Sequence, residues 1–390
     1  MVHTQTAMST VPESPYGPLD LAVGWLIGWE DRPPLPALPP GAGLRSVVEA
    51  LLEPAVATGG PVGIPLFGGS GSAVILGVAN DLARRGGHEL PVPLSLVLEG
   101  TELEGEYVYQ QRIVEHFGLQ DRWERVDARG ELELLGPHAR AALTANGVQF
   151  PANVFWARPL LARLGGGTFV VSHGVEELAS WWPYRPLWET LRFRRRPSVA
   201  AAALGLLATL PPVARAAAVR RFRAAPSLPW LRPAAQAQLA RATSELTPSP
   251  RWAKALPQMR RQRCHTQVPR SYAQTAAEFG VGTVFPWQTP EIAAWVLADS
   301  TSAGAPPVQE MLPRWFGDLV PPDLPFRRDR ANYGGLFYGP ATRAFGRDWS
   351  GAGLDESLVD PQVLRRLWAS DEHDWRSAAL MQTAWLHDQG

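Results

Sequence analysis

A run of glycines and serines, placed between an apolar segment and a helical pattern, is the first feature that could perform chemistry. In PLFGGSGSAVILGVA, Pro65 to Ala79, a buried strand should end in Gly68-Gly69-Ser70-Gly71-Ser72 and continue directly into a helix. Glycines allow a tight turn with N–H groups pointing outward, and a helix N-terminus adds positive charge, so the segment favours a bound phosphate. The spacing matches neither the Walker pattern nor Gly-x-Gly-x-x-Gly, and an ordinary strand–helix connection is an equal alternative.

Two adjacent carboxylates form the second candidate, in VVSHGVEELASW, Val170 to Trp181. The segment follows a predicted strand, so it should reach the same carboxyl edge of a sheet as the glycine loop, which is where ligands bind in open parallel sheets. Glu176 and Glu177 could hold Mg²⁺, which takes one or two carboxylates together with phosphate oxygens. Alternatively, both carboxylates start a helix and face solvent, where charge at a helix N-terminus is favourable.

Both segments belong to an alternation of short apolar runs with helical patterns, which predicts a parallel sheet covered on both faces and an α/β fold. The expected strands are 62–67, 94–98, 123–126 and 168–171, and the expected helices are 44–56, 72–85, 104–117, 132–146 and 155–164. From about Trp182 the alternation stops, which predicts an all-helical second half with helices at 199–210, 213–224, 233–244, 251–280, 290–297, 361–369 and 375–386. The proline-rich run from Pro33 to Pro40 cannot be helical and is expected to be a linker or an extended strap.

Composition narrows the class of protein. The chain has 390 residues, 37 basic and 37 acidic, and this balance argues against a general nucleic-acid or anionic-membrane binder. Cys264 is the only cysteine and Lys254 the only lysine, which excludes an intrachain disulfide and limits any lysine-dependent mechanism. The N-terminus does not read as a signal peptide, and the longest apolar stretch, Val199 to Leu210, is too short for a membrane span. We therefore expect a cytoplasmic location and no stable membrane association.

Taken in order, the two motifs resemble those of the asparagine synthetases and the related β-lactam synthetases and lasso-peptide cyclases. Those proteins carry Ser-Gly-Gly-x-Asp-Ser-Ser after a first strand, as FGGSGSA does from Phe67 to Ala73. About 100 residues later they carry Gly-x-Gly-Gly/Ser-Asp-Glu-Leu/Ile-Phe, which SHGVEELA from Ser172 to Ala179 resembles. FRRDRANYGGLFYGPATRAFGRDW, Phe326 to Trp349, is similar to a stretch of actinobacterial asparagine-synthase-related proteins in which a Lys-Ala pair precedes aromatic residues.

The resemblance implies an ATP-pyrophosphatase core followed by a helical C-terminal region. It divides the chain into an N-terminal segment and proline-rich linker (1–43), a nucleotide-binding α/β core (44–190) and a helical region (191–390). ATP and Mg²⁺ would be the cofactors, Glu176 and Glu177 the metal ligands, and Arg330 with Arg328 the catalytic cations. The nucleotide would be held by residues from the strand ends and the two loops, namely Leu66, Phe67, Gly68, Gly69, Ser70, Ser72, Val97, Val171, Ser172 and Gly174.

Departures from the family pattern affect three separate parts of that chemistry. Gly71 stands where the loop Asp would bind Mg²⁺, and Glu176 replaces a second Asp. Val175 adds bulk where a phosphate should approach, and Arg330 stands where the family has lysine. The family usually also has a glutaminase domain with an N-terminal cysteine, and because this sequence has no cysteine before Cys264, we expect that glutamine does not supply ammonia by that route.

Other candidates have weaker support. His265 could act as a base, although such a residue is more often packed or solvated, and Cys264 is expected to be buried. The arginines that bracket the Ala-rich helix could grip an acidic peptide or a lipid surface but are more typical of a solvated helix face; they are Arg192, Arg194, Arg195, Arg196, Arg220, Arg221 and Arg223. Trp181, Trp182 and Trp188 should form core or a pocket wall.

Two hypotheses therefore stand side by side. In the first, the chain is an ATP-dependent amide synthetase that adenylates a small aspartate-like acid or a peptide carboxylate, releases pyrophosphate, and lets ammonia or an amine attack. In the second, it is a catalytically silent relative that binds a nucleotide or a peptide.

Overall fold

The computed structural model describes residues 14–97, 105–180, 182–192, 198–211, 213–215, 217–218, 228–302, 304–321, 333–371 and 373–389, and a parallel sheet lies at its centre. The strand order is β3-β2-β1-β4-β5, and every neighbouring pair is parallel. The sheet confirms the α/β class. The strands are β1 (Val62–Pro65), β2 (Val92–Leu96), β3 (Glu124–Val126), β4 (Thr168–Val170) and β5 (Gly282–Val284).

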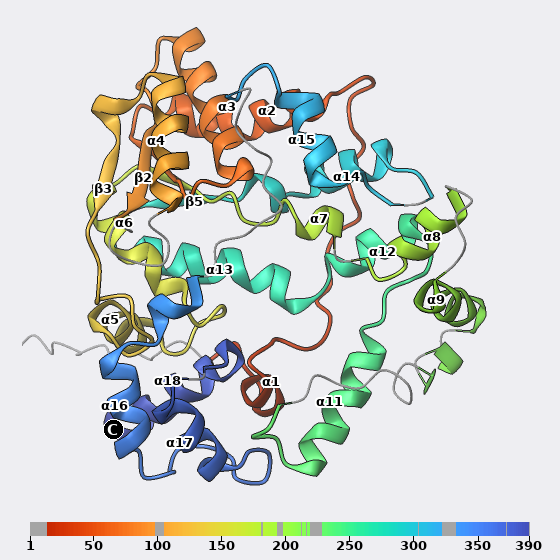
Figure 1. The fold of residues 1–390 in the computed structure, drawn as a ribbon. Coiled ribbons are helices and arrows are strands. Elements are labelled where there is room, and N and C mark those ends of the chain that lie inside the picture. The colour runs from red at the N-terminus through yellow and green to blue at the C-terminus, as the bar shows by residue number, and fades with distance from the viewer. Residues whose placement is uncertain are drawn as a thin grey trace, which may run out of the picture.

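Helices cover both faces of this sheet (Figure 1). One face, with Ile64, Leu66 and Val170 fully buried, packs against α2 (Leu44–Ala57), α3 (Ser70–Gly86), α4 (Gly105–Phe117), α14 (Pro290–Asp299) and α15 (Val308–Phe316). The other face, with Leu94, Leu96 and Phe169, packs against α6 (Arg158–Leu164), the 3₁₀ turn η2 (Val154–Ala157) and α13 (Arg263–Ala277). Strands buried on both faces explain the continuous apolar runs that identified them in the sequence.

A third hydrophobic cluster lies below the sheet in Figure 1 and joins the two ends of the chain. Trp230, which is fully buried, donates a hydrogen bond from Nε1 to the carbonyl oxygen of Ala22 at 2.8 Å. The first and third clusters each take residues from both sides of the predicted boundary at 190, and the third also crosses the one at 43. The helices of this lower group are α1 (Pro18–Val23), α5 (Pro137–Asn146), α11 (Pro233–Glu245), α16 (Pro340–Asp348), α17 (Pro361–Ala369) and α18 (Ala378–Gln389).

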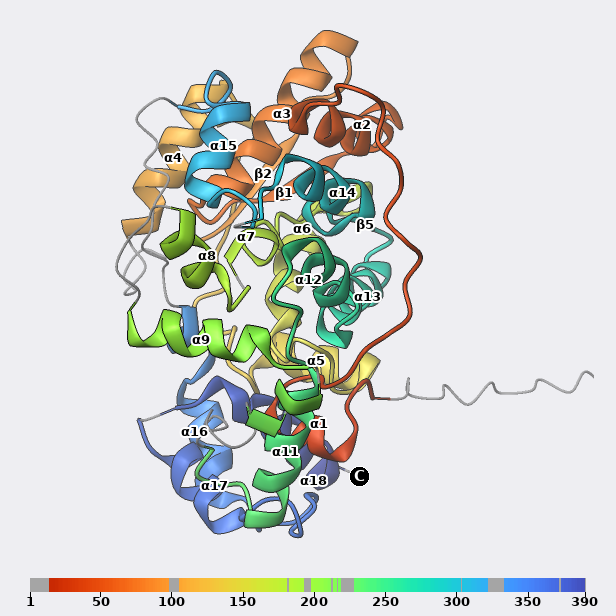
Figure 2. The same cartoon turned by 90° about the vertical axis from the view of Figure 1, so that its right-hand side faces the viewer.

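The proline-rich segment is an extended strap, as the sequence predicts. Residues 30–39 adopt no helix or strand, and they run along the outside of the molecule from α1 to α2 (Figure 2). Antiparallel pairing of Trp29 with Gln262 attaches the start of the strap between α12 (Trp252–Met259) and α13. The remaining elements are α7 (Glu177–Ser180), α8 (Arg185–Arg192) and α9 (Val199–Thr209), with the 3₁₀ turns η1 (Gln120–Arg122), η3 (Pro286–Gln288), η4 (Tyr333–Phe337) and η5 (Trp375–Ser377).

The structure corrects three expectations. The second half is not all-helical, because β5 pairs with β4 at the edge of the sheet. The helix expected over 251–280 is two helices, since the chain turns at 260–262 to pair with the strap. The helix expected from Leu132 begins only at Pro137, because Gly136 is its N-cap and proline suits the first helical position.

Some expectations concern residues that the structure describes only in part. Most of the helix expected over 213–224 lies outside the described residues. Within the described ranges, no helix has both the length and the apolar character needed to cross a membrane.

Candidate functional site

The two predicted loops meet at one edge of the sheet. The glycine loop leaves the carboxyl end of β1, and the Ser172–Glu177 loop leaves the carboxyl end of β4. Because β1 pairs with β2 on one side and β4 on the other, the strand order reverses between β1 and β4. Both loops therefore share one edge of the sheet, which confirms the expectation from the sequence. Ligands in open α/β sheets bind at such a reversal of strand order.

The glycine loop is tightly held beside α4. Gly68 has φ +77°, and a Cβ atom there would lie 2.8 Å from Oε2 of Glu106 and 3.2 Å from Cβ of Tyr109. Glycine is therefore required for both conformation and space. Glu106 is only 6% exposed, so a buried carboxylate lies directly against the loop that was expected to receive a phosphate.

The start of α3 partly retains the expected geometry. Gly69 is the N-cap, and a Cβ atom there would meet nothing within 4 Å. The Ser72 hydroxyl donates to the carbonyl oxygen of Gly69 at 2.9 Å, and Ser72 itself is buried. The N–H groups of this first turn are arranged as at an ordinary helix start, with Gly69 exposed and Ser70 half-buried.

The second loop turns on Gly174, whose φ is +113°. A Cβ atom there would lie 2.6 Å from Cγ of Gln288, so this position also requires glycine. Glu176 is half-buried, and Glu177 begins α7 with its side chain 17% exposed. Oε1 of Glu177 lies 3.8 Å from Nε2 of His173 and faces a small pocket beside the strap.

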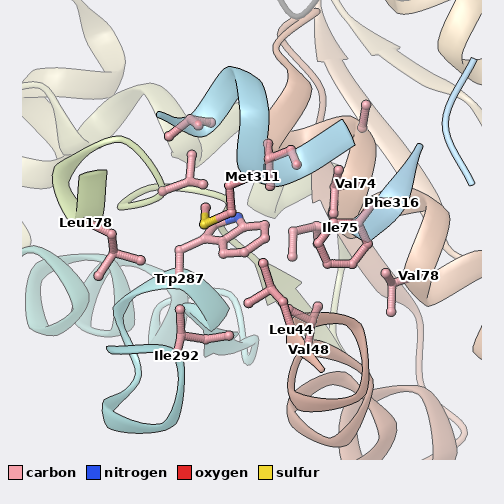
Figure 3. Packing of buried hydrophobic residues seen from close by; sticks show 14 of the residues in the cluster. Leu44, Val48, Val74, Ile75, Val78, Leu178, Trp287, Ile292, Met311 and Phe316 are labelled. Carbon is pink, nitrogen blue, oxygen red and sulfur yellow. The ribbon is translucent and has the colours of Figure 1, made fainter. Parts of the chain in front are cut away.

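The space between the two loops is filled by apolar side chains. A Cβ atom on Gly71 would lie 3.2 Å from Cγ1 of Val175 and 3.9 Å from Nε1 of Trp287. Val175 is 7% exposed, and Trp287 is fully buried within the same hydrophobic cluster. In Figure 3 the Trp287 ring lies among Ile75, Met311 and other apolar side chains of that cluster.

A large cavity opens on the other side of the loops. Its volume is about 560 Å³, and Phe67, Val171 and Ser172 line it, as do Leu96 at the end of β2 and the 333–338 segment. Phe67 makes edge-to-face contacts with Trp156 and Tyr333, with ring centroids 4.9 and 5.5 Å apart. The wall is mainly apolar and rich in aromatic side chains, which are Tyr16, Trp25, Phe67, Phe150, Trp156, Tyr272, Tyr333, Phe337, Tyr338 and Trp375.

Polar groups in this wall are few. Nε1 of Trp156 donates to the Tyr272 hydroxyl at 2.7 Å, and burial raises the pKa of Tyr272, so that hydroxyl stays protonated. Besides the tyrosines, the other hydrogen-bonding side chains are Asn153, Ser172 and His173 and the indole N–H groups of Trp25 and Trp375. Among the described residues, the wall contains no arginine, lysine, aspartate or glutamate.

The structure therefore places the predicted site residues in different environments. Phe67, Val171 and Ser172 line the cavity, whereas Gly174 and Glu177 line the small pocket. Leu66 is fully buried in the core, and Val97 is half-buried after β2, where its N–H donates to the carbonyl oxygen of Val126 at 2.9 Å. Arg328 and Arg330 lie outside the described residues.

Most of the aromatic wall was missed by sequence reasoning. Its members come from segments as distant as Tyr16 and Trp375, and only the topology brings them together. The high content of 16 tryptophans was the available signal, but it does not distinguish core from cavity wall. Trp182, which is 2% exposed, belongs to the core as expected, and Trp181 lies outside the described residues.

The residues at the loops do not fit a magnesium–pyrophosphate group. Among the residues described, no group of three or more His, Cys, Asp or Glu side chains could hold a metal ion. Mg²⁺ needs near-octahedral oxygen ligands, and the apolar Val175 lies where a ligating side chain at position 71 would extend.

The structure also shows the environments of Cys264 and His265, the two other candidates from the sequence. Burial raises the pKa of the Cys264 thiol to about 12, so the cysteine is buried, as expected, and unreactive. His265 lines the small pocket together with Arg32 and Arg260.

A comparison with protein families and with curated proteins found no family model and no curated sequence that matches this chain.

Proposed function

We propose that this chain is a ligand-binding protein whose ligand is apolar or aromatic, and that it does not perform magnesium-dependent adenylation. The observation that carries the proposal is the wall of the cavity at the carboxyl edge, which is apolar, rich in aromatic side chains and, among the described residues, free of carboxylates, guanidinium groups and amines. A charged group placed there would lose its hydration without gaining a partner. A cavity of several hundred Å³ with apolar walls and few polar groups is typical of ligand sites.

Of the ligand classes that the family resemblance implies, an apolar peptide segment suits this wall best. Free aspartate carries two carboxylates at neutral pH, and the described wall offers them no cation. The base of a nucleotide could stack on Trp156 or Tyr333, but the described part of the wall offers its triphosphate no arginine or lysine. An aromatic or aliphatic side chain of a peptide needs no cation in the wall. Asn153 and Ser172 can hydrogen-bond the backbone of such a peptide.

The test is calorimetric titration of the purified chain with capped peptides rich in Phe and Leu, beside ATP and adenosine. Ala152 lines the cavity, so Ala152→Phe should fill part of it and weaken peptide binding at least tenfold. Ala237, exposed on α11, provides the matched control, and Ala237→Phe should leave the affinity unchanged. If Ala152→Phe and Ala237→Phe bind peptide equally well, or if no apolar ligand binds the wild type, the cavity is not the site.

Amide synthesis remains the second candidate, and one observation favours it. The glycine loop and the Ser172–Glu177 loop lie side by side at the strand-order reversal, as the family resemblance requires. Arg330 would then supply the cation that lysine supplies in the family. Pyrophosphate release from ATP, measured with a panel of acids, tests this candidate directly.

A further inference from the structure

A small pocket behind the second loop holds a group of basic side chains that belongs to neither candidate activity. Its volume is about 30 Å³, and it is lined by Arg32 from the strap, Arg260 from the α12–α13 turn, His265 from the first turn of α13, and Glu177 from the start of α7.

The strap places Arg32 in this pocket through several specific contacts. The Glu30 N–H donates to the carbonyl oxygen of Arg261 at 2.6 Å, and the Glu30 carboxylate pairs with Arg270 at 2.6 Å. Asp31 pairs with the exposed guanidinium of Arg261 at 2.5 Å. The two carboxylates next to Arg32 are therefore already engaged with other arginines.

Arg32 and Arg260 have no such partners. Both are half-buried, and neither side chain makes an ion pair or a hydrogen bond with any residue of the described ranges. Burial, followed by the charge of Arg32, lowers the pKa of Arg260 to about 10, although Glu291 acts in the opposite direction. Burial also lowers the pKa of Arg32, and the charge of Arg270 adds to this effect while Glu30 opposes it.

Unsatisfied polar atoms lie in the same wall. Both Oε1 and Nε2 of Gln288 are inaccessible to solvent and have no hydrogen-bond partner, and the same holds for Nε1 of the fully buried Trp287. Both residues line the pocket. The Gln288 amide lines the pocket together with the two unpaired guanidinium groups, and its unpartnered Nε2 is a donor without an acceptor, although buried polar groups in proteins are normally satisfied.

We propose that the pocket bounded by Arg32, Arg260 and His265 binds a small oxyanion, either a free tetrahedral ion such as phosphate or the carboxylate of a larger molecule. Glu177 is the carboxylate that lines the pocket, and against two guanidinium groups it leaves a net positive charge. Guanidinium groups bind oxyanions through paired, charge-assisted hydrogen bonds, and Gln288 Nε2 is a further donor.

The test is calorimetric titration of the full chain with inorganic phosphate, sulfate and acetate, with NaCl holding the ionic strength constant. Phosphate or acetate should bind saturably, and Arg260→Gln and Arg32→Gln should each weaken that binding at least tenfold. Arg32 lies in an extended strap, so its variant should fold even if Arg260→Gln does not. Tighter binding of phosphate than acetate would assign a tetrahedral ion, and the reverse would assign a carboxylate.

Arg261→Gln is the matched control, because Arg261 is adjacent in sequence and contacts the same strap but is exposed and paired with Asp31. Its oxyanion affinity should stay within twofold of the wild type. Ala152→Phe should leave oxyanion binding unchanged, which separates this site from the cavity. The proposal is wrong if the wild type shows no saturable oxyanion binding, or if Arg32→Gln binds as tightly as Arg261→Gln.

Discussion

Val175 lies directly beside the position that a side chain at Gly71 would occupy, across the two loops that define the candidate site. A Cβ atom on Gly71 would lie 3.2 Å from Cγ1 of Val175, which is closer than most such contacts in proteins. The two positions correspond to a metal-binding Asp and a small Gly or Ser in the family that the sequence resembles. Both differences from the family therefore affect the same small space. The metal-binding carboxylate is absent at Gly71, and the larger Val175 side chain fills the room that Gly or Ser would leave.

This contact predicts how restoring the missing ligand will behave. Gly71→Asp alone should not create magnesium-dependent ATP binding, because its side chain must displace Val175 from a close-packed cluster. Gly71→Asp combined with Val175→Gly should tighten ATP binding at least fivefold when Mg²⁺ is added, with Glu176 as the second carboxylate. Calorimetry on both variants, with Val175→Gly as the control, checks this, and tight magnesium-dependent binding by Gly71→Asp alone would contradict it.

Packing around Trp287 predicts a large effect on stability. Trp287 is fully buried against the start of α3, so Trp287→Ala should lower the free energy of unfolding by about 3–5 kcal/mol. Trp375 is 58% exposed, so Trp375→Ala should cost less than about 1 kcal/mol. Urea denaturation of both variants measures the difference. Equal costs would mean that Trp287 is not part of a close-packed core.

The buried imidazole of His265 predicts a loss of stability in acid. Burial, followed by the charges of His173, Arg32 and Arg260, lowers the pKa of His265 to about 4. In the unfolded chain a histidine titrates near 6.5, so between about pH 6.5 and 4 the unfolded state binds the extra proton. The free energy of unfolding should therefore fall as the pH falls through this window, by at most about 3 kcal/mol from this residue.

His265→Gln should remove that part of the pH dependence. Urea denaturation at pH 7 and pH 4.5 measures it for the wild type and the variant, with His88→Gln at an exposed position as the control. The same slope in the wild type and in His265→Gln would show that other groups cause the acid destabilisation.

Arg330 separates the two candidate functions. If the chain makes amides, Arg330→Ala should abolish pyrophosphate release while ATP affinity stays nearly unchanged, because the cation acts only as charge develops in the transition state. Arg330→Lys should then keep or raise the activity. In a binding protein, neither the wild type nor either variant releases pyrophosphate. A wild type that turns over as fast as Arg330→Ala would show that the role assigned to this residue is wrong.

Much of the sheet could be predicted from the sequence, because its inner strands are apolar runs bounded by glycines and helical patterns. The strands at 62–65, 92–96, 124–126 and 168–170 lie within two residues of their expected bounds. β5 was missed because it has three residues, one of them glycine, and follows a long helical pattern. An edge strand of this kind is recognised only through its pairing with β4.

The sequence predicts where the two loops of the site lie, but not which side chains surround them. The strand ends place both loops at one edge, but the sequence does not show that Glu177 faces the strap or that Val175 closes the gap beside Gly71. The cavity wall joins Tyr16, Phe67, Trp156 and Trp375, which are far apart in the chain. Such a wall depends on long-range packing, which no local pattern encodes.

The most direct test of the central claim is the affinity of the wild-type chain for ATP, measured by calorimetry with and without Mg²⁺. This measurement does not depend on knowing the acid or the amine. Val175 fills the space beside Gly71, and the described residues include no group of three or more His, Cys, Asp or Glu side chains that could hold a metal. The two dissociation constants should therefore agree within twofold. Binding that becomes at least tenfold tighter with Mg²⁺, and loses this gain in Glu176→Ala, would contradict the account and establish a metal–nucleotide site.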